Sequence, residues 1–449
     1  MAGIIEQIDP TTLVVDTNIR TSAPIDKGFV DSIAANGVLT PILAWRDVDG
    51  TVKVRAGQRR TLAAREAGVA SVPVFIVDQE ADTAERIIQQ IVENDQREGL
   101  TDADRIQAWR ALELEGVSAT KIAQRTGAKR DHVKTGLTVA ANGTSTAAVV
   151  EHGMTLDQAA ALIEFEDDAD LVAELTRWAI EEPDYFPVAV QRAHNDRVRG
   201  ALREKIEAEE AAKGHRILDD SPGWNETPYR LRDLTTADGG EVTAELVQGR
   251  EGVAVYIAVY SDDDARVNYY VDNPDALGLT VREGVQASAP QSGPMTDGQK
   301  AERKVLIANN KEWDAAETVR REWLAAFLAR KTTPKDAQAV IAAAVTTARW
   351  KVADGLTHGT DVAAGLLAIE NPHSTAGLAD YLTAHPNRAV HLTLAMILGG
   401  IEHGTDRNTW RNPRPDTAWY FQTLAAWGYP LCPVEKIAAM IQDEPTSTE

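Results

Sequence analysis

Residues 1–92 alternate short apolar segments with amphipathic ones. The run Val72-Pro73-Val74-Phe75-Ile76-Val77 is apolar and short enough for a strand, whereas residues 81–93 carry apolar side chains at helical spacing. The pattern predicts strands at 13–15, 42–45, 52–54 and 72–77, and helices at 29–36, 61–66 and 81–93. This alternation predicts a small α/β domain.

Residues 101–142 follow the 3.6-residue period of helices throughout. Thr101 is placed to cap the first helix. Two short helices follow over 118–127 and 128–137, joined by a turn at Gly127, and the second opens with polar and basic residues. This pattern is typical of a helix-turn-helix. Its shared core is expected to contain Ile122, Ala123, Val133 and Leu137.

The rest of the chain changes character twice. Apolar β-type runs at 253–260 and 267–271 predict a small β-rich element, and Pro, Gly and Ser mark a linker near residues 289–294. We therefore expect a multidomain α+β protein. Its parts are an α/β domain at 1–98, a helix-turn-helix and helical domain at 99–213, a β-rich element at 214–283, a linker at 284–298, a helical C-terminal domain at 299–442 and a disordered tail at 443–449.

Charge is distributed unevenly over the 449 residues, whose formal net charge is −22. Residues 1–142 hold 17 Lys and Arg against 20 Asp and Glu, so most of the acidity belongs to the later residues. Within 118–135, five basic side chains (Lys121, Arg125, Lys129, Arg130 and Lys134) face the single acid Asp131. A compact basic cluster at the predicted helix-turn-helix favours contact with DNA phosphates.

Cysteine use and hydropathy exclude several classes of protein. Cys432 is the single cysteine, so an intramolecular disulfide framework and a cysteine-rich metal site are excluded, and we expect this residue to be buried. The chain shows neither a secretory signal nor an apolar run long enough to span a membrane. We therefore expect a cytoplasmic protein.

Two polar segments carry candidate chemistry. Gly57-Gln58-Arg59-Arg60 lies between a predicted strand and a predicted helix, where a glycine permits close approach of a phosphate and the arginines neutralise it. Glu93-Asn94 could hold a hard cation against those phosphates. Taken alone, the arginines could be ordinary surface charge, and the second segment could simply end a helix.

Together these segments resemble the ParB partition proteins, over about the first third of the chain. The resemblance rests on Ser32-Ile33 with Asn36-Gly37, on Thr40-Pro41-Ile42, on Gly57-Gln58-Arg59-Arg60, on Glu93-Asn94 with Arg97, and on the helix-turn-helix segment 127–137. Such proteins combine a ParB/sulfiredoxin-type nucleotide-binding domain with a helix-turn-helix domain.

The resemblance implies a CTP-gated DNA clamp that acts as a homodimer in plasmid, phage or chromosome partition. It implies CTP and Mg²⁺ as cofactors, double-stranded DNA as ligand and a ParA-type ATPase as a candidate partner. The nucleotide-binding residues it implies are Thr40, Gly57, Gln58, Arg59, Arg60, Asn94 and Arg97, with Glu93 and Asn94 at the metal. The implied DNA-binding residues are Lys121, Lys129, Arg130, His132, Lys134 and Thr135.

Three features depart from the family. Gln58 replaces a glutamate, and Thr40 lies where many members have glutamine. Because an amide cannot take a proton from an attacking water, we expect nucleotide binding with slow or absent hydrolysis, and Gln58 is the one weak catalytic candidate. The acidic C-terminal half does not resemble the short basic dimerisation domain of chromosomal members.

Two other functions remain open. The first is a transcriptional regulator that uses the helix-turn-helix without sliding. The second is a nucleotide-using enzyme, a kinase or a nuclease, on the same scaffold, with Asp26, Asp95 or Glu98 as its acid or base.

Overall fold

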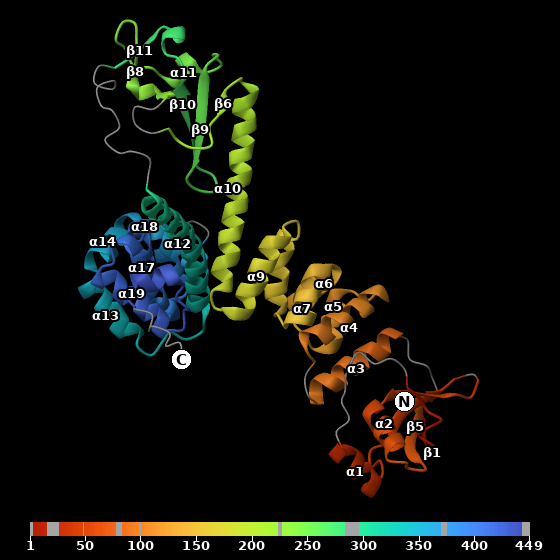
Figure 1. The fold of residues 1–449 in the computed structure, drawn as a ribbon. Helices are drawn as coiled ribbons and strands as arrows, with labels where there is room; N and C mark the ends of the chain where they lie inside the picture. Colours follow the sequence, from red (N-terminus) through yellow and green to blue (C-terminus); the bar gives the residue numbers. More distant parts are fainter. Residues whose placement is uncertain are drawn as a thin grey trace. The chain divides into compact units, whose positions relative to one another are not determined.

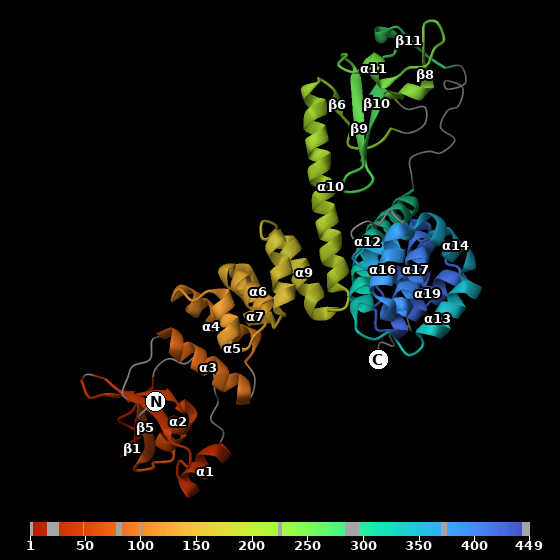
Figure 2. The same cartoon turned by 180° about the vertical axis from the view of Figure 1, so that it is seen from behind.

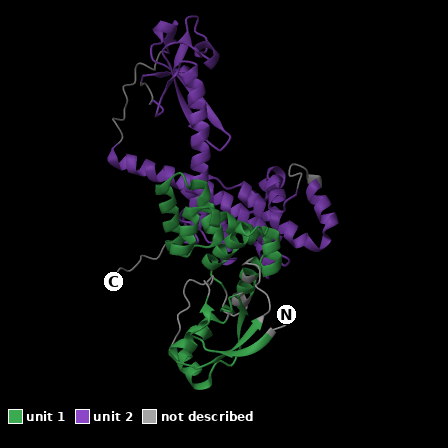
Figure 3. Ribbon diagram, turned by 90° about the vertical axis from the view of Figure 1, so that its right-hand side faces the viewer, with its two compact units in different colours: residues 1–181 green, residues 182–449 purple. Residues whose placement is uncertain are grey.

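The computed structural model describes residues 3–15, 27–47, 49–77, 83–97, 100–222, 227–282, 296–369 and 375–441. The chain divides into two compact units, residues 1–181 and 182–449, which are coloured separately in Figure 3. Among the described helices, none has the length and apolar character needed to cross a bilayer.

A five-stranded mixed sheet forms the first part of unit 1. Its strands are β1 (Gly3–Ile8), β2 (Val14–Val15), β3 (Ile42–Arg46), β4 (Val52–Ala56) and β5 (Val72–Val77), in the order β1-β5-β3-β4-β2. β3 lies parallel to β5 and antiparallel to β4. Ile42, Ala44, Val54, Val72 and Val74 form its buried core.

The sequence patterning did not predict β1. This strand pairs antiparallel with β5, and its consecutive side chains Ile4 and Ile5 are both exposed. An edge strand without apolar alternation carries little local signal, because a distant partner specifies it.

Two helices accompany the sheet: α1 (Lys27–Asn36) and α2 (Gln58–Glu66). We expected the second of these to begin at Thr61, but it begins three positions earlier, directly after Gly57. The difference matters because it places Gln58, Arg59 and Arg60 in the first turn of a helix rather than in a loop.

The predicted helix-turn-helix is present in unit 1 (Figure 1). Its helices are α4 (Asp102–Leu114), α5 (Ala119–Thr126) and α6 (Arg130–Ala141), and α3 (Thr83–Arg97) packs against α4 and α5. Thr101 caps α4 in a reciprocal capping box with Asp104, as its position predicted. The expected core residues Ile122, Ala123, Val133 and Leu137 are all buried.

Short helices complete unit 1. They are α7 (Gly143–His152), α8 (Leu156–Ala161), the 3₁₀ turn η1 (Leu162–Phe165) and α9 (Ala169–Glu181). Leu156, Leu162 and Phe165 are buried, and α8 packs against α6 and η1.

Unit 2 begins with the long helix α10 (Phe186–Ala212), followed by the β-rich element that the sequence predicted. Strands β6 (Arg216–Ile217), β9 (Val253–Val259), β10 (Ala265–Val271) and β7 (Tyr229–Arg230) form one sheet in that order. β8 (Leu234–Thr236) and β11 (Leu279–Val281) form a second, two-stranded sheet. The short helical pieces η2 (Leu231–Asp233), α11 (Ala244–Val247) and η3 (Asp275–Leu277) connect the strands.

The remainder of unit 2 is one helical body, seen from behind in Figure 2. Its first helix, α12 (Asp297–Ala329), has 33 residues. The others are α13 (Ala337–Thr347), α14 (Arg349–His358), α15 (Thr360–Leu366), α16 (Thr375–Ala384), η4 (Pro386–Arg388), α17 (Ala389–His403), α18 (Arg407–Arg411), α19 (Pro415–Ala426) and α20 (Pro433–Ala438). The central helix α17 packs closely on α14, where a Cβ built on Gly355 would lie 2.1 Å from Gly400 Cα.

Candidate nucleotide and DNA sites

The glycine that opens the first candidate segment has a backbone that other residues rarely adopt. Gly57 caps α2 with φ 101° and ψ 22°, in the left-handed region, and it offers no capping side chain. Its carbonyl accepts the N–H of Thr61 at 3.0 Å, which starts the helix directly. A helix start without a side-chain acceptor suits an anionic ligand, because the first-turn N–H groups and the helix dipole both favour negative charge.

Arg60 joins two of the predicted nucleotide-binding positions. Its Nη1 donates to the carbonyl oxygen of Thr40 at 2.5 Å and to that of Pro41 at 3.0 Å. A Cβ on Gly57 would lie 3.2 Å from Arg60 Nη2, so the glycine also leaves room for this guanidinium. The structure therefore brings Thr40, Gly57 and Arg60 together, with Arg60 holding the Thr-Pro segment beside the helix start.

Arg59 lies in a different environment. Its guanidinium carbon is 5.3 Å from the centroid of the Phe29 ring on α1, and the side chain is half-buried. Gln58, the first residue of α2, is also half-buried. The two adjacent arginines thus contact different elements, α1 and the Thr-Pro segment.

The second candidate segment lies on the last turns of α3. The side chains of Glu93, Asn94, Asp95 and Arg97 are outside the described residues, as are Asp26 and Glu98 altogether. Convergence of the two segments on one triphosphate thus stays a prediction. Among the described side chains, no group of three or more His, Cys, Asp or Glu could hold a metal ion.

The candidate DNA face lies on α5 and α6. Lys121, Lys129, Arg130 and Lys134 are exposed, and Thr135 is half-buried. Lys129 is the N-cap residue of α6 and Arg130 its first residue, so two cations lie at the start of the second helix. The N-terminal end of that helix is the part that reads DNA in helix-turn-helix proteins.

His132 differs from these cations because it contacts α4. Its ring meets Trp109 edge-on, with centroids 5.5 Å apart and planes at 84°, and its Nε2 is 3.9 Å from Asp102 Oδ1. Through these contacts, His132 helps pack α6 against α4.

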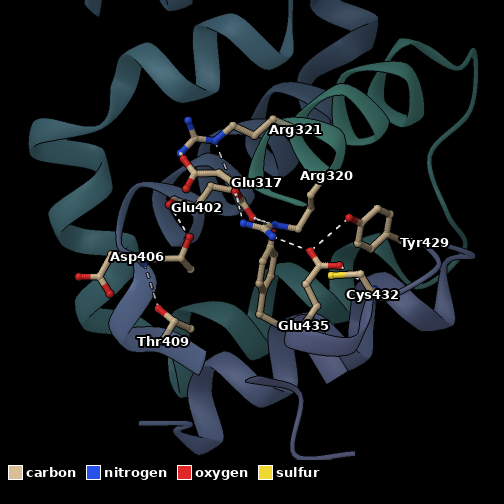
Figure 4. Close-up of polar contacts among 11 residues, drawn as sticks. Glu317, Arg320, Arg321, Glu402, Asp406, Thr409, Tyr429, Cys432 and Glu435 are labelled. Carbon is tan, nitrogen blue, oxygen red and sulfur yellow. Dashed lines mark hydrogen bonds and ion pairs between the residues drawn. The ribbon is translucent and has the colours of Figure 1, made fainter. Parts of the chain in front are cut away.

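Unit 2 contains a buried ionic network that the sequence pattern did not predict (Figure 4). Arg320 on α12 donates to both oxygens of Glu402 on α17, at 2.6 and 3.0 Å, and to Glu435 on α20 at 2.6 Å. All three side chains have no exposed surface. The hydroxyls of Tyr420 and Tyr429 complete it, donating to Glu402 and Glu435 at 2.7 and 3.1 Å.

The two carboxyl groups of this network differ in their titration. Burial works to raise the pKa of Glu402, but Arg320 and the Tyr420 hydroxyl together hold that pKa below its ordinary value. For Glu435 burial prevails and raises the pKa. Because protein groups satisfy these carboxylates, the network joins α12, α17 and α20 rather than forming a ligand site.

The sequence did contain one signal of this network. Trp313, Ala316, Leu324 and Phe327 form the buried stripe of α12, and Arg320 occupies a position in the same stripe. An arginine at a core position requires buried acids. Local patterning cannot identify them, because they follow 82 and 115 positions later.

Unit 1 is thus an α/β domain with a glycine-started, arginine-bearing helix, followed by a helix-turn-helix with a cationic second helix. Residues 7–95 match the family model of the ParB N-terminal domain. Over its N-terminal part, the chain is thus similar to the ParB partition proteins.

Curated relatives extend the match beyond that domain. The probable chromosome-partitioning protein ParB of Treponema pallidum is 31% identical over 137 residues, covering 30% of this chain and 42% of the relative. The chromosome-partitioning protein Spo0J of Thermus thermophilus is 31% identical over 184 residues, covering 41% of this chain and 65% of the relative. The chain therefore spans less than two thirds of the length of these relatives.

Two solved structures of the C-terminally truncated ParB of Caulobacter crescentus are also similar. One, complexed to the centromeric parS site, is 24% identical, covers 39% of this chain and 91% of its own, and has a TM-score of 0.29. The other, complexed with CTP-gamma-S, is 28% identical, covers 38% and 98%, and has a TM-score of 0.20.

Proposed function

We propose that this chain is a ParB-type DNA partition protein that binds CTP in its N-terminal domain and DNA through its helix-turn-helix. The observation that carries the proposal is the contact of Arg60 with the Thr40 and Pro41 carbonyls beside the left-handed Gly57. It joins a candidate base-contacting segment to a candidate phosphate-binding helix start within one small domain.

The residues at this site suit a nucleoside triphosphate. The N–H groups at the start of α2 would bind the phosphates, and Gly57 lets them approach the backbone. Arg59 would supply positive charge, while Arg60 keeps the Thr-Pro segment in position for the base. Mg²⁺, which would neutralise charge on the triphosphate, is assigned to Glu93 and Asn94 by the family resemblance.

DNA binding is proposed for the exposed cations of α5 and α6. Lys129 and Arg130 at the start of α6 would face the major groove, and Lys121 would contact a phosphate on the flank. The proposal includes the clamp itself: a homodimer whose N-terminal domains close on nucleotide, and which works with a ParA-type ATPase.

Calorimetric titration of the full chain with CTP, ATP, GTP and UTP tests the nucleotide site. We expect CTP to bind and Arg59→Ala and Arg60→Ala each to abolish the binding heat, with DNA affinity nearly unchanged. Arg46→Ala is the matched control, since Arg46 belongs to the same sheet domain and forms a partly exposed ion pair with Glu6. Equal CTP affinity in wild type and both site variants would count against the site, and a preference for ATP would favour the enzyme alternative.

Gln58 makes slow hydrolysis part of the proposal. An amide can orient a water but cannot accept its proton, so Gln58→Glu should raise CTP turnover while binding persists. Turnover is measured as released phosphate. A rapid wild-type reaction, or no gain in the variant, would contradict this role.

The sliding clamp is separated from a simple regulator by where the protein lies on DNA. With CTP, the protein should spread from its site along a linear duplex closed at both ends, and should be lost when one end is free. Footprints that stay confined to the site with and without CTP would support a transcriptional regulator instead.

A further inference from the structure

An ion pair joins the two parts of unit 1 to which the proposed function assigns nucleotide and DNA. Glu85 lies in the first turn of α3, within the matched ParB domain, and Arg125 lies in the last turn of α5. Arg125 Nη2 donates to Glu85 Oε2 at 2.5 Å, across 40 positions of sequence. The pair is therefore a tertiary contact between the nucleotide domain and the helix-turn-helix.

The surroundings of Glu85 favour its charged form. Its hydrogen bond with Arg125 is the main cause that holds the pKa of Glu85 below its usual value, and the more distant Arg55 guanidinium acts in the same direction. Gln89, one turn along α3, donates to the other carboxylate oxygen at 3.4 Å. Arg55 lies on β4, two residues before Gly57, so the carboxylate of Glu85 is influenced both by a charge next to the candidate nucleotide site and by Arg125 of the helix-turn-helix.

Arg125 belongs by sequence and charge to the candidate DNA face. It follows Lys121 by one helical turn on α5 and precedes Lys129 and Arg130 at the start of α6. Its side chain is 40% exposed, which leaves it accessible to solvent and to a phosphate. A guanidinium bound to a carboxylate cannot at the same time make a full bidentate contact with a DNA phosphate.

We propose that Glu85 is a positioning residue that competes with DNA phosphates for Arg125, so that the contact of α3 with α5 and the binding of DNA oppose each other. This inference rests on the proposed function. Because α3 also carries Glu93 and Asn94, a nucleotide that engages α3 changes the availability of Arg125, and by linkage DNA changes the affinity for nucleotide.

The salt dependence of DNA binding measures this competition directly. In wild type there are two cases. If Arg125 stays with Glu85, it displaces no cation from the DNA; if it moves to a phosphate, the Glu85 carboxylate that it leaves takes up a cation from solution. In both cases DNA binding releases one cation fewer, on balance, than it would if Arg125 were free. Glu85→Gln should therefore steepen the slope of log affinity against log salt by about 0.9, the value of one phosphate contact. At low salt the variant should bind a random-sequence fluorescent duplex about two- to fivefold more tightly, in line with a partly exposed ion pair.

The control is a matched ion pair on α4. Arg110 and Glu113 form a pair whose side chains are 41% and 40% exposed, against 40% and 37% for Arg125 and Glu85. Glu113→Gln removes the same charge and should leave the salt slope unchanged. The double variant Glu85→Gln/Arg125→Gln should lose the gain, because the released guanidinium is absent.

Several outcomes separate this inference from the proposed function. With CTP present, the ratio of DNA affinities with and without nucleotide should move toward one in Glu85→Gln. Suppose that wild type binds both DNA and CTP. An unchanged salt slope in Glu85→Gln, or a gain in DNA affinity that persists in the double variant, would then overturn the proposed competition for Arg125 and leave the proposed function standing. A wild type that binds neither ligand overturns the proposed function on which it rests.

Discussion

The indole of Trp109 lies directly against Gly136, where α6 crosses α4. A Cβ built on Gly136 would lie 2.5 Å from Trp109 Cζ3 and 2.6 Å from its Cε3. Trp109 is 1% exposed, so the ring has no free space into which to move. The close packing of α6, the candidate DNA-reading helix, on α4 therefore requires a residue without a side chain at position 136.

Gly136→Ala should accordingly destabilise unit 1. Overpacking of this kind costs about 1–3 kcal/mol, less the gain in helix propensity that alanine brings. Chemical denaturation followed by Trp fluorescence checks the free energy of unfolding. Gly143→Ala is the control, because its Cβ meets nothing within 4 Å and the residue also lies in a helix; a loss as large in that variant would show that packing on Trp109 is not the cause.

Gly57→Ala should weaken nucleotide binding by more than its effect on folding. The left-handed φ of 101° strains any residue with a Cβ, at a cost of about 1–2 kcal/mol, and the new methyl would press on Arg60. Gly50 shares a positive φ, 87°, but its Cβ would meet nothing. Gly50→Ala should therefore cost similar stability while CTP affinity, measured by calorimetry, is retained.

Replacing the two acids of the Arg320 network should have unequal effects. Glu402→Gln leaves a buried guanidinium without its two-oxygen partner, which costs about 3–5 kcal/mol in such settings. Glu435→Gln should cost less, because burial already disfavours the charged form of Glu435. Urea denaturation of both variants compares them, and a larger loss in Glu435→Gln would contradict the assignment.

The difference in unfolding free energy between wild type and each of these two variants should change with pH in opposite directions. The pKa of Glu402 is lower in the folded chain than its ordinary value of 4.5, so its contribution is present above that value and lost as pH falls. The gap in stability between wild type and Glu402→Gln should narrow below about pH 4.5. The raised pKa of Glu435 predicts the reverse, a gap that shifts in favour of wild type as pH falls.

Cys432 should be unreactive in the folded chain. The side chain is 3% exposed, and burial raises the pKa of its thiol well above the usual value, so little thiolate forms. A disulfide reagent that reacts with free thiols should label Cys432 only when the helical body unfolds. Faster labelling of Glu402→Gln than of wild type is expected, whereas rapid labelling of native wild type would contradict the burial.

The features that could be predicted depend on local sequence pattern, and those that could not depend on tertiary contacts. Ile122 and Val133 were identifiable because helical spacing and the turn at Gly127 are properties of neighbouring residues. The β1 strand was not, because its register depends on β5 some seventy positions away. For the same reason, Arg60 was predicted as a phosphate ligand, and its bonds to two carbonyls twenty residues earlier in the chain were not foreseen.

Those bonds of Arg60 have a consequence for selectivity. One planar guanidinium ties the carbonyls of Thr40 and Pro41 to the first turn of α2, so a displacement of one segment strains its bonds to the other. Under the proposed function, a nucleobase that displaces the Thr-Pro peptide would also shift the amides that meet its phosphates. A nucleotide with a poorly fitting base would then be bound more weakly through its triphosphate, and the site would discriminate between pyrimidines and purines in this way.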